Sequence, residues 1–343
     1  MKALPFLVFS AFLASISCGD AGTTQDENSV TPPLPFSEVA VDLPLTSGPL
    51  ADYLIFANDV PRDQVMTLRQ DLSVIDAWDG TMSTGESQRL KDLLEIASTT
   101  PTDLGIWFKT RMKYILQNDL TKYQLGLVFA SQNQIGLQTL GNDDNQDDAN
   151  TGGGNIGTAI YETTLTEKRN RDSLSYIIVR INDKWVPVLS PDVGLMRIGP
   201  ALFDPDFQVN HSSIRALSNS LQRLEVLFHE ARHSDGNEAA GSLGFSHVNC
   251  PDDGTVPSEL VGVPACDDTG NGAYSVGAAV LKPLMHLCER RCSIPEQEIL
   301  KSIYIDRISR VIPSGPNLKL LDPKPETGFN SVNISDFQAF TLR

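Results

Sequence analysis

One segment constrains the fold of this chain more than any other, because residues 213–233 are predicted to form a single amphipathic helix. At about 100° per residue, its apolar side chains fall on one stripe, which needs a core to pack against. This stripe comprises Ile214, Leu217, Leu221, Leu224, Phe228 and Ala231. His229 and His233 point roughly 130° away from the centre of the stripe, so we expect them to face a cleft and not the core.

The two histidines belong to the motif His229-Glu230-Ala231-Arg232-His233. Residues at this spacing lie one turn apart on the same helix face, so both imidazoles can bind one Zn²⁺. The intervening Glu230 then lies beside the metal, where it can accept a proton from a bound water whose pKa the metal lowers to about 7. Two histidines on a solvated helix face, without a metal, are the alternative that this pattern leaves open.

The segment resembles the active-site helix of the zincin metallopeptidases, which carries the same HExxH motif. The resemblance covers residues 213–233 and extends at most to the hairpin before them. It implies that His229 and His233 are zinc ligands and that Glu230 is the general base. It also implies an α+β, zincin-like fold, in which a small β-sheet or hairpin packs on the active-site helix, with an N-terminal and a C-terminal helical region.

The motif does not fix the third protein ligand. In metzincins HExxH extends to HExxHxxGxxH or HExxHxxGxxD, and here Gly236 matches the glycine but Ala239 occupies the ligand position. We predict His247 instead, because it lies in a glycine-rich loop and three of the five histidines of the chain fall within residues 229–247. The alternatives are carboxylates, namely Asp235, Glu238, Asp267 and Asp268.

The first 17 residues have the pattern of an export signal, with Lys2 before an apolar stretch from Ala3 to Phe12. The next residue, Cys18, resembles the acylated cysteine of bacterial lipoproteins, although Ser15 occupies the place where leucine is usual. An ordinary secretory signal cut at the same point is the alternative. Both interpretations predict export, and the lipoprotein interpretation predicts that the protein contacts a membrane only through the lipid on Cys18.

Four further cysteines are predicted to form disulfides, because their number is even and disulfides persist in exported proteins. They lack the paired CxxC spacing of structural zinc sites. The favoured pairs are Cys250–Cys266 and Cys288–Cys292, although the spacing does not exclude the other pairings. A Cys250–Cys266 disulfide would hold the loop that contains His247 against the cleft.

Helical patterns precede and follow the motif helix. Three of them lie between residues 60 and 118, with apolar side chains over 65–75, 90–97 and 102–115. Residues 234–272 are rich in glycine and aspartate and are predicted to be mostly loop. A helix over 273–290 follows, disturbed at Pro283, and a last helix starts at Ser293, where Glu296 completes a capping box.

Two strand patterns lie between the N-terminal helices and the motif helix. Residues 175–181 and 185–189 flank Asn182-Asp183-Lys184, which predicts a hairpin. Pro187 would place the second strand at a sheet edge. We therefore divide the chain into a signal peptide (1–17), a flexible tether (18–50), an N-terminal helical region (51–130) and a zincin-like metallopeptidase domain (131–343).

The charge of the chain restricts its partners. Lys and Arg number 27 against 43 acidic residues, a formal net charge of −16, so the phosphates of nucleic acids would repel it.

We expect an extracytoplasmic, lipid-anchored zinc metalloendopeptidase that hydrolyses a peptide or protein substrate. The alternative is a non-catalytic surface lipoprotein that binds a partner, with a structural or fortuitous metal site. Arg232 and Tyr274 lie near the motif and are candidates for stabilising an oxyanion, but we expect a structural role for both.

Overall fold

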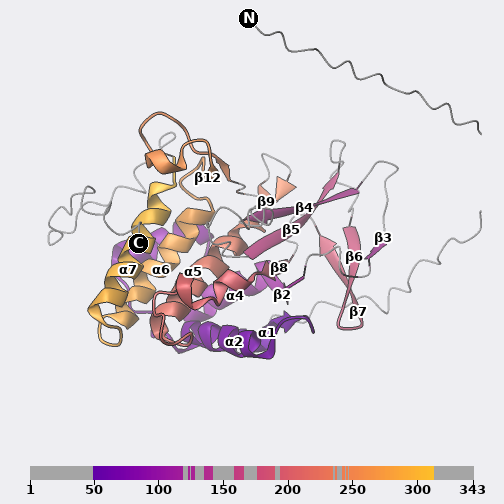
Figure 1. Cartoon of the computed structure of the whole chain (residues 1–343), viewed down its shortest axis with the longest axis horizontal. Coiled ribbons are helices and arrows are strands. Elements are labelled where there is room, and N and C mark those ends of the chain that lie inside the picture. Colours follow the sequence, from indigo (N-terminus) through magenta and orange to yellow (C-terminus); the bar gives the residue numbers. More distant parts are fainter. Residues whose placement is uncertain are drawn as a thin grey trace, which may run out of the picture. The chain divides into compact units, whose positions relative to one another are not determined.

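Helix α5, Leu217–His233, carries the motif and lies among the other helices of the chain (Figure 1). The computed structural model describes residues 49–118, 123, 125–127, 135–141, 158–165, 176–189, 194–234, 236–237, 242–243, 245 and 247–312. These residues combine helices with small sheets, so the predicted α+β class is confirmed. Within this described part, no helix is both long enough and apolar enough to span a membrane.

The predicted N-terminal helices are present, and their capping residues explain where two of them begin. Ser83 caps α3 in a capping box with Glu86, and Thr100 caps α4 ahead of Pro101 at the first helical position. The elements of this region are α1 (Leu50–Tyr53), β1 (Ile55–Phe56), α2 (Arg62–Ala77), α3 (Thr84–Leu94) and α4 (Pro101–Arg111).

The third predicted helix ends earlier than its pattern indicated. It was expected to include Ile115, but it stops at Arg111 and the chain continues as strand β2, Met112–Leu116, whose residues are all buried. Strand β2 pairs with β1 on one side and with β8, Gly194–Ile198, on the other. Pairing on both sides satisfies the backbone of β2, and this tertiary arrangement overrides the helical periodicity of its side chains.

Strand β2 belongs to a five-stranded sheet in the order β1-β2-β8-β5-β4. Strands β1, β2 and β8 are mutually parallel, whereas β5 (Thr158–Leu165) is antiparallel to β8 and to β4 (Ile135–Gly141). Helix α5 contacts β5, so the motif helix packs on this sheet.

The predicted hairpin lies in a separate three-stranded sheet. It consists of β6 (Tyr176–Ile181) and β7 (Lys184–Leu189), with β3 (Leu125–Leu127) on the other side of β6. The turn residues Asn182 and Asp183 have φ angles of 49° and 63°, as a two-residue type I′ turn requires. Pro187 lies in the edge strand β7, as predicted, where its missing N–H is not needed for a further strand.

The C-terminal helices are α6, Ala273–Cys288, and α7, Ile294–Ser309, and both lie beside α5 (Figure 1). Pro283 lies inside α6, and Ser293 caps α7 in the predicted capping box with Glu296. Between α5 and α6, the described residues form only short elements, in agreement with the predicted loop. These are β9 (Gly236–Asn237), β10 (Ser242–Leu243), β11 (Val248–Asn249), a 3-10 helix (Ser258–Leu260) and β12 (Pro264–Cys266).

The apolar stripe of α5 packs in the core, as predicted. Its buried members are Leu221, Leu224, Phe228 and Ala231, and Ile214 and Leu217 pack against the same core while partly buried. The ring of Phe228 stacks on Trp107 of α4, with centroids 5.7 Å apart and an interplanar angle of 4°. Side chains from residues 50–116 and from α5, α6 and α7 share one hydrophobic core, so the N-terminal helices are packed directly against the motif helix.

Helix α5 begins at Leu217 and not at residue 213, where the sequence pattern starts. The residues before it form turns, and two segments among them, Pro200–Leu202 and Pro205–Phe207, are short 3-10 helices. The N–H of Ala216 and the side-chain amide of Asn219 both donate to the carbonyl of Ser213, each at 2.9 Å. These bonds close a turn at Ser213 and delay the first helical residue.

The polar face of α5 is also buried, and its charges pair with distant segments. Arg223 forms a bidentate ion pair with Asp71 of α2, at 2.6 and 2.9 Å, and both side chains are 0% exposed. Glu225 accepts hydrogen bonds from Arg307 of α7 at 2.8 and 3.2 Å. At Gly277, α6 approaches so closely that a Cβ atom there would lie 2.5 Å from Oε1 of Glu225. The motif helix is therefore covered on more than one face.

Candidate metal site

The structure brings together the three histidines that the sequence predicted as ligands. His229 and His233 lie in the last two turns of α5, and His247 precedes strand β11. One ligand atom from each ring lies within 4.8 Å of the others, which makes this group able to hold a metal ion. The ring centroids of His247 lie 5.1 Å from His229 and 4.7 Å from His233.

The two motif histidines are buried, with exposed fractions of 5% for His229 and 0% for His233. This burial excludes the alternative of histidines on a solvated helix face. Residues from other segments also contact this face of α5. The ring of Tyr274, at the start of α6, lies 4.5 Å from the rings of both His229 and His247 and is stacked on the latter.

Burial keeps the three imidazoles neutral. It lowers the pKa of His229 well below its ordinary value, the pKa of His233 to about 3 and the pKa of His247 to about 4. His247 lowers the pKa of the other two further, and the nearby Arg310 and Arg307 lower that of His247. Neutral imidazole is the form that binds metals, so the group is in its ligating state at neutral pH.

Unsatisfied ring nitrogens indicate that a metal fits this group. Both ring nitrogens of His233 and Nδ1 of His229 are buried without a hydrogen-bond partner in the described part of the chain. A buried polar atom without a partner costs about 1–3 kcal/mol, which a metal–nitrogen bond would offset. Nε2 of His229 and Nε2 of His247 are 3.1 Å apart. Nitrogens bound to one tetrahedral Zn²⁺ at 2.0–2.1 Å are about 3.3 Å apart, a close match.

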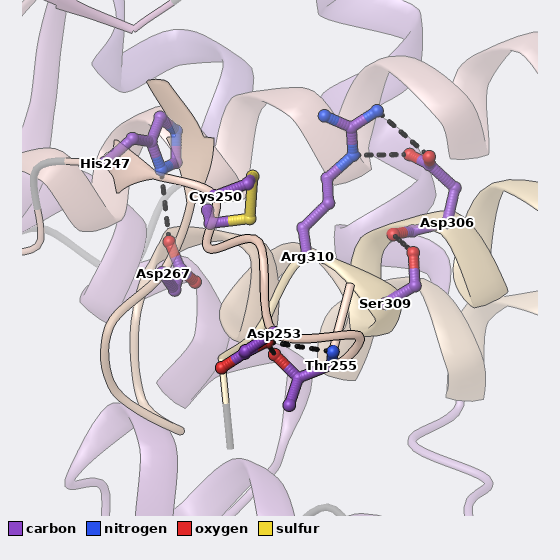
Figure 2. Close-up of a disulfide and its surroundings, with 9 residues drawn as sticks. His247, Cys250, Asp253, Thr255, Asp267, Asp306, Ser309 and Arg310 are labelled. Atoms are coloured by element: carbon purple, nitrogen blue, oxygen red, sulfur yellow. Dashed lines mark hydrogen bonds and ion pairs between the residues drawn. A yellow bond between two sulfur atoms is a disulfide. The ribbon is translucent and has the colours of Figure 1, made fainter. Parts of the chain in front are cut away.

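Two of the four carboxylates predicted as alternative ligands, Asp267 and Asp268, lie among the described residues. Asp267 is buried in the site, but its Oδ1 lies 3.1 Å from Nδ1 of His247 (Figure 2) and so contacts a ligand residue. Burial raises the pKa of the Asp267 carboxyl to about 7, against the opposing influence of His233 and two backbone amides. Asp268 is exposed. Asp235 and Glu238 lie outside the described residues, as does Cys18.

Both predicted disulfides are confirmed. Cys250–Cys266 joins the ends of β11 and β12, which also pair as an antiparallel ladder, and Cys288–Cys292 closes the end of α6. His247 lies just before the first of these strands, and Asp267 follows the second directly. The Cys250–Cys266 disulfide therefore ties together the two segments that carry the contact between His247 and Asp267 (Figure 2).

Glu230 lies next to His229 on α5, and its side chain is 1% exposed. Arg232, also on this helix, donates from Nε to the carbonyl of Asn271 at 3.0 Å and lies 3.8 Å from the ring centroid of Phe245. Arg232 therefore helps to fix the loop before α6, which agrees with the structural role expected for it.

Sequence reasoning missed the position of Tyr274 against the two histidines. The guanidinium groups of Arg307 and Arg310 lie 5.7 and 5.3 Å from the centroid of its ring. Asp306 binds both arginines, so α7 supplies an ion-pair network behind the tyrosine. No sequence spacing relates Tyr274 to the motif, because a disulfide-bonded loop separates the two in the chain.

Comparisons of the chain with protein-family models, with curated proteins and with solved structures found no match in any of the three.

Proposed function

We propose that the protein is a zinc metallopeptidase of the zincin type, and the buried, neutral histidine group carries this proposal. His229, His233 and His247 would hold the metal, since one ligand atom of each ring lies within 4.8 Å of those of the other two. Nitrogen ligands suit Zn²⁺, and three protein ligands are typical of catalytic zinc sites, which leave one position open. A structural zinc site would have four.

A bound Zn²⁺ would lower the pKa of a water molecule and polarise a substrate carbonyl. The residues of the chain supply the remaining functions. Glu230 would accept the proton of the attacking water on its carboxylate and later donate it to the leaving amine. Tyr274 packs against the rings of two of the histidines and would help to hold them in place.

The zincin-type architecture and the cellular location belong to the same proposal. Helix α5 contacts β5 of the larger sheet, which resembles the packing of a zincin helix on its sheet. Two disulfides in one chain are typical of an exported protein, which supports the interpretation of residues 1–17 as an export signal. We also propose Cys18 as the site of lipid attachment. Mass spectrometry of the first mature residue would test the lipid.

One observation favours the alternative function, a non-catalytic surface lipoprotein with a structural metal site. His233 is fully buried and His229 nearly so, whereas a substrate must reach a catalytic metal. The two functions differ in what they require of Glu230: a structural site does not need this carboxylate as a base.

The direct test of the function is peptide hydrolysis by the full chain loaded with one equivalent of Zn²⁺. A pool of unstructured peptides is incubated with the protein, and mass spectrometry identifies new peptide termini. We expect cleavage that a zinc chelator stops and that added Zn²⁺ restores. A zinc-loaded chain that cleaves no peptide in the pool would exclude the peptidase and leave the structural-site alternative.

The disulfides give a second prediction. Replacing Cys250 and Cys266 with serine should weaken Zn²⁺ binding by roughly tenfold or more, because a disulfide of this loop length constrains the chain by about 2–4 kcal/mol and 1.4 kcal/mol corresponds to tenfold. Replacing Cys288 and Cys292 should have a smaller effect, since this pair closes the end of α6. Competition with a zinc-binding dye measures both affinities, and equal losses would contradict the link between the first disulfide and the metal.

A further inference from the structure

The carboxylate of Asp267 makes contacts that hold it in one orientation. Its Oδ1 lies 3.1 Å from Nδ1 of His247. Its Oδ2 accepts hydrogen bonds from the backbone N–H groups of Tyr274, at 2.9 Å, and of Ser275, at 3.4 Å, at the start of α6. The side chain is 2% exposed. The two backbone N–H groups donate to Oδ2, and Oδ1 faces the ring of His247, so the two oxygens have distinct partners.

The backbone around Asp267 is fixed as well. Its N–H donates to the carbonyl of Arg310 at 2.9 Å, and its carbonyl accepts from the N–H of Ile312 at 2.8 Å, so the residue is paired with the chain after α7. Gly272 leaves the space for the carboxylate, because a Cβ atom there would lie 2.3 Å from Cγ and 2.4 Å from Oδ2 of Asp267. The fold thus positions this carboxylate from both sides.

The contact with Asp267 decides which nitrogen of His247 carries the proton. In its ionised form Asp267 cannot donate, so Nδ1 of His247 then carries the hydrogen and the lone pair lies on Nε2. Nε2 is the atom that lies 3.1 Å from Nε2 of His229, inside the histidine group. The lone pair of His247 therefore lies on the ring nitrogen that faces His229.

We propose that Asp267 is the positioning residue of the metal site, fixing the tautomer and ring orientation in which His247 binds the metal. The inference rests on the proposed function, because it concerns the same three histidines. A carboxylate behind a ligating imidazole also makes the imidazole a stronger ligand, and losing such a partner typically costs about 10–100-fold in metal affinity.

Asp267→Asn tests this directly, because it keeps the shape of the side chain and changes its hydrogen bonding. The two backbone donors of α6 still require an oxygen at the Oδ2 position. The amide NH₂ must then face Nδ1 of His247, which favours the tautomer with the hydrogen on Nε2. We expect the Zn²⁺ affinity to fall about 10–100-fold. We also expect ¹⁵N NMR of the metal-free protein to show His247 protonated on Nδ1 in the wild type and on Nε2 in the variant.

Two further variants separate positioning from general damage to the fold. Gly272→Ala should lower the Zn²⁺ affinity because it displaces the carboxylate, whereas Gly85→Ala should not, since a Cβ atom at Gly85 has no neighbour within 4 Å.

The outcomes distinguish this inference from the proposed function. A wild-type chain that binds no Zn²⁺ refutes the metal site itself. If the wild type and Asp267→Asn bind Zn²⁺ equally tightly, the role of Asp267 alone is overturned. The same follows if His247 of the metal-free wild type carries its proton on Nε2. NMR of the wild type tests which ring nitrogen of His247 is protonated, even if a variant does not fold.

Discussion

Replacing Glu230 with glutamine is expected to abolish peptide hydrolysis while leaving Zn²⁺ bound. Glutamine has nearly the same shape as glutamate but cannot accept the proton of the attacking water, and positioned general bases contribute about 10²–10⁴-fold to rate. The metal should stay, because the proposed ligands are His229, His233 and His247. The measurements are kcat/KM of the zinc-loaded chain and its zinc content.

The matched control is His229→Ala, which should lose both the metal and the activity. The two variants must be compared, because replacing a base leaves the metal bound, whereas replacing a ligand releases it. A Glu230→Gln variant that cleaves peptides as well as the wild type would remove Glu230 from the chemistry. A variant that loses zinc would make Glu230 part of the metal site and not the base.

Replacing Arg223 with leucine is expected to have the largest effect on stability. The change leaves Asp71 buried without its bidentate partner, and breaking a buried ion pair from one side costs about 3–5 kcal/mol. A domain of this kind is stable by about 5–15 kcal/mol in total, so a large share of the stability would be lost. Denaturant unfolding followed by circular dichroism measures the change.

An exposed ion pair provides the control. Glu298 contacts Lys301 within α7 at 2.6 Å, and its side chain is 61% exposed. Glu298→Ala should therefore change the free energy of unfolding by less than about 1 kcal/mol. Similar losses for the two variants would mean that the Asp71–Arg223 pair does not join α2 to α5 as tightly as its geometry indicates.

The sequence predicted best those elements whose signals are local. The apolar stripe of α5 and the hairpin turn at Asn182-Asp183 depend only on residues a few positions apart, and both are as expected. The capping box of α7 is local in the same sense. Helix α4 ends earlier than predicted, where strand β2 finds partners on both sides, and those partners are distant in the sequence.

The polar face of α5 shows why the long-range contacts could not be predicted from the sequence. Arg223 and Glu225 have the pattern of a solvated helix face, but the fold pairs them with Asp71 and Arg307, residues separated from them by 152 and 82 positions. A helical period contains no information on such partners. The burial of His229 and His233 depends on the same kind of long-range packing.

The contact between His247 and Asp267 was beyond prediction for a similar reason. The sequence identified both as candidate ligands, His247 as the predicted third ligand and Asp267 as one of the alternatives. Their different roles follow from the pairing of β11 with β12, and from the backbone amides of Tyr274 and Ser275, which direct one carboxylate oxygen away from His247.

The most direct test of the metal site is a crystal of the full chain grown with Zn²⁺ and measured on both sides of the zinc absorption edge. The anomalous difference map should show one zinc bound by ring nitrogens of His229, His233 and His247, each about 2.0–2.1 Å from it. Asp267 should remain on Nδ1 of His247 and should not touch the metal. A zinc peak elsewhere in the chain, with the histidine group empty, would contradict the site and the function proposed from it.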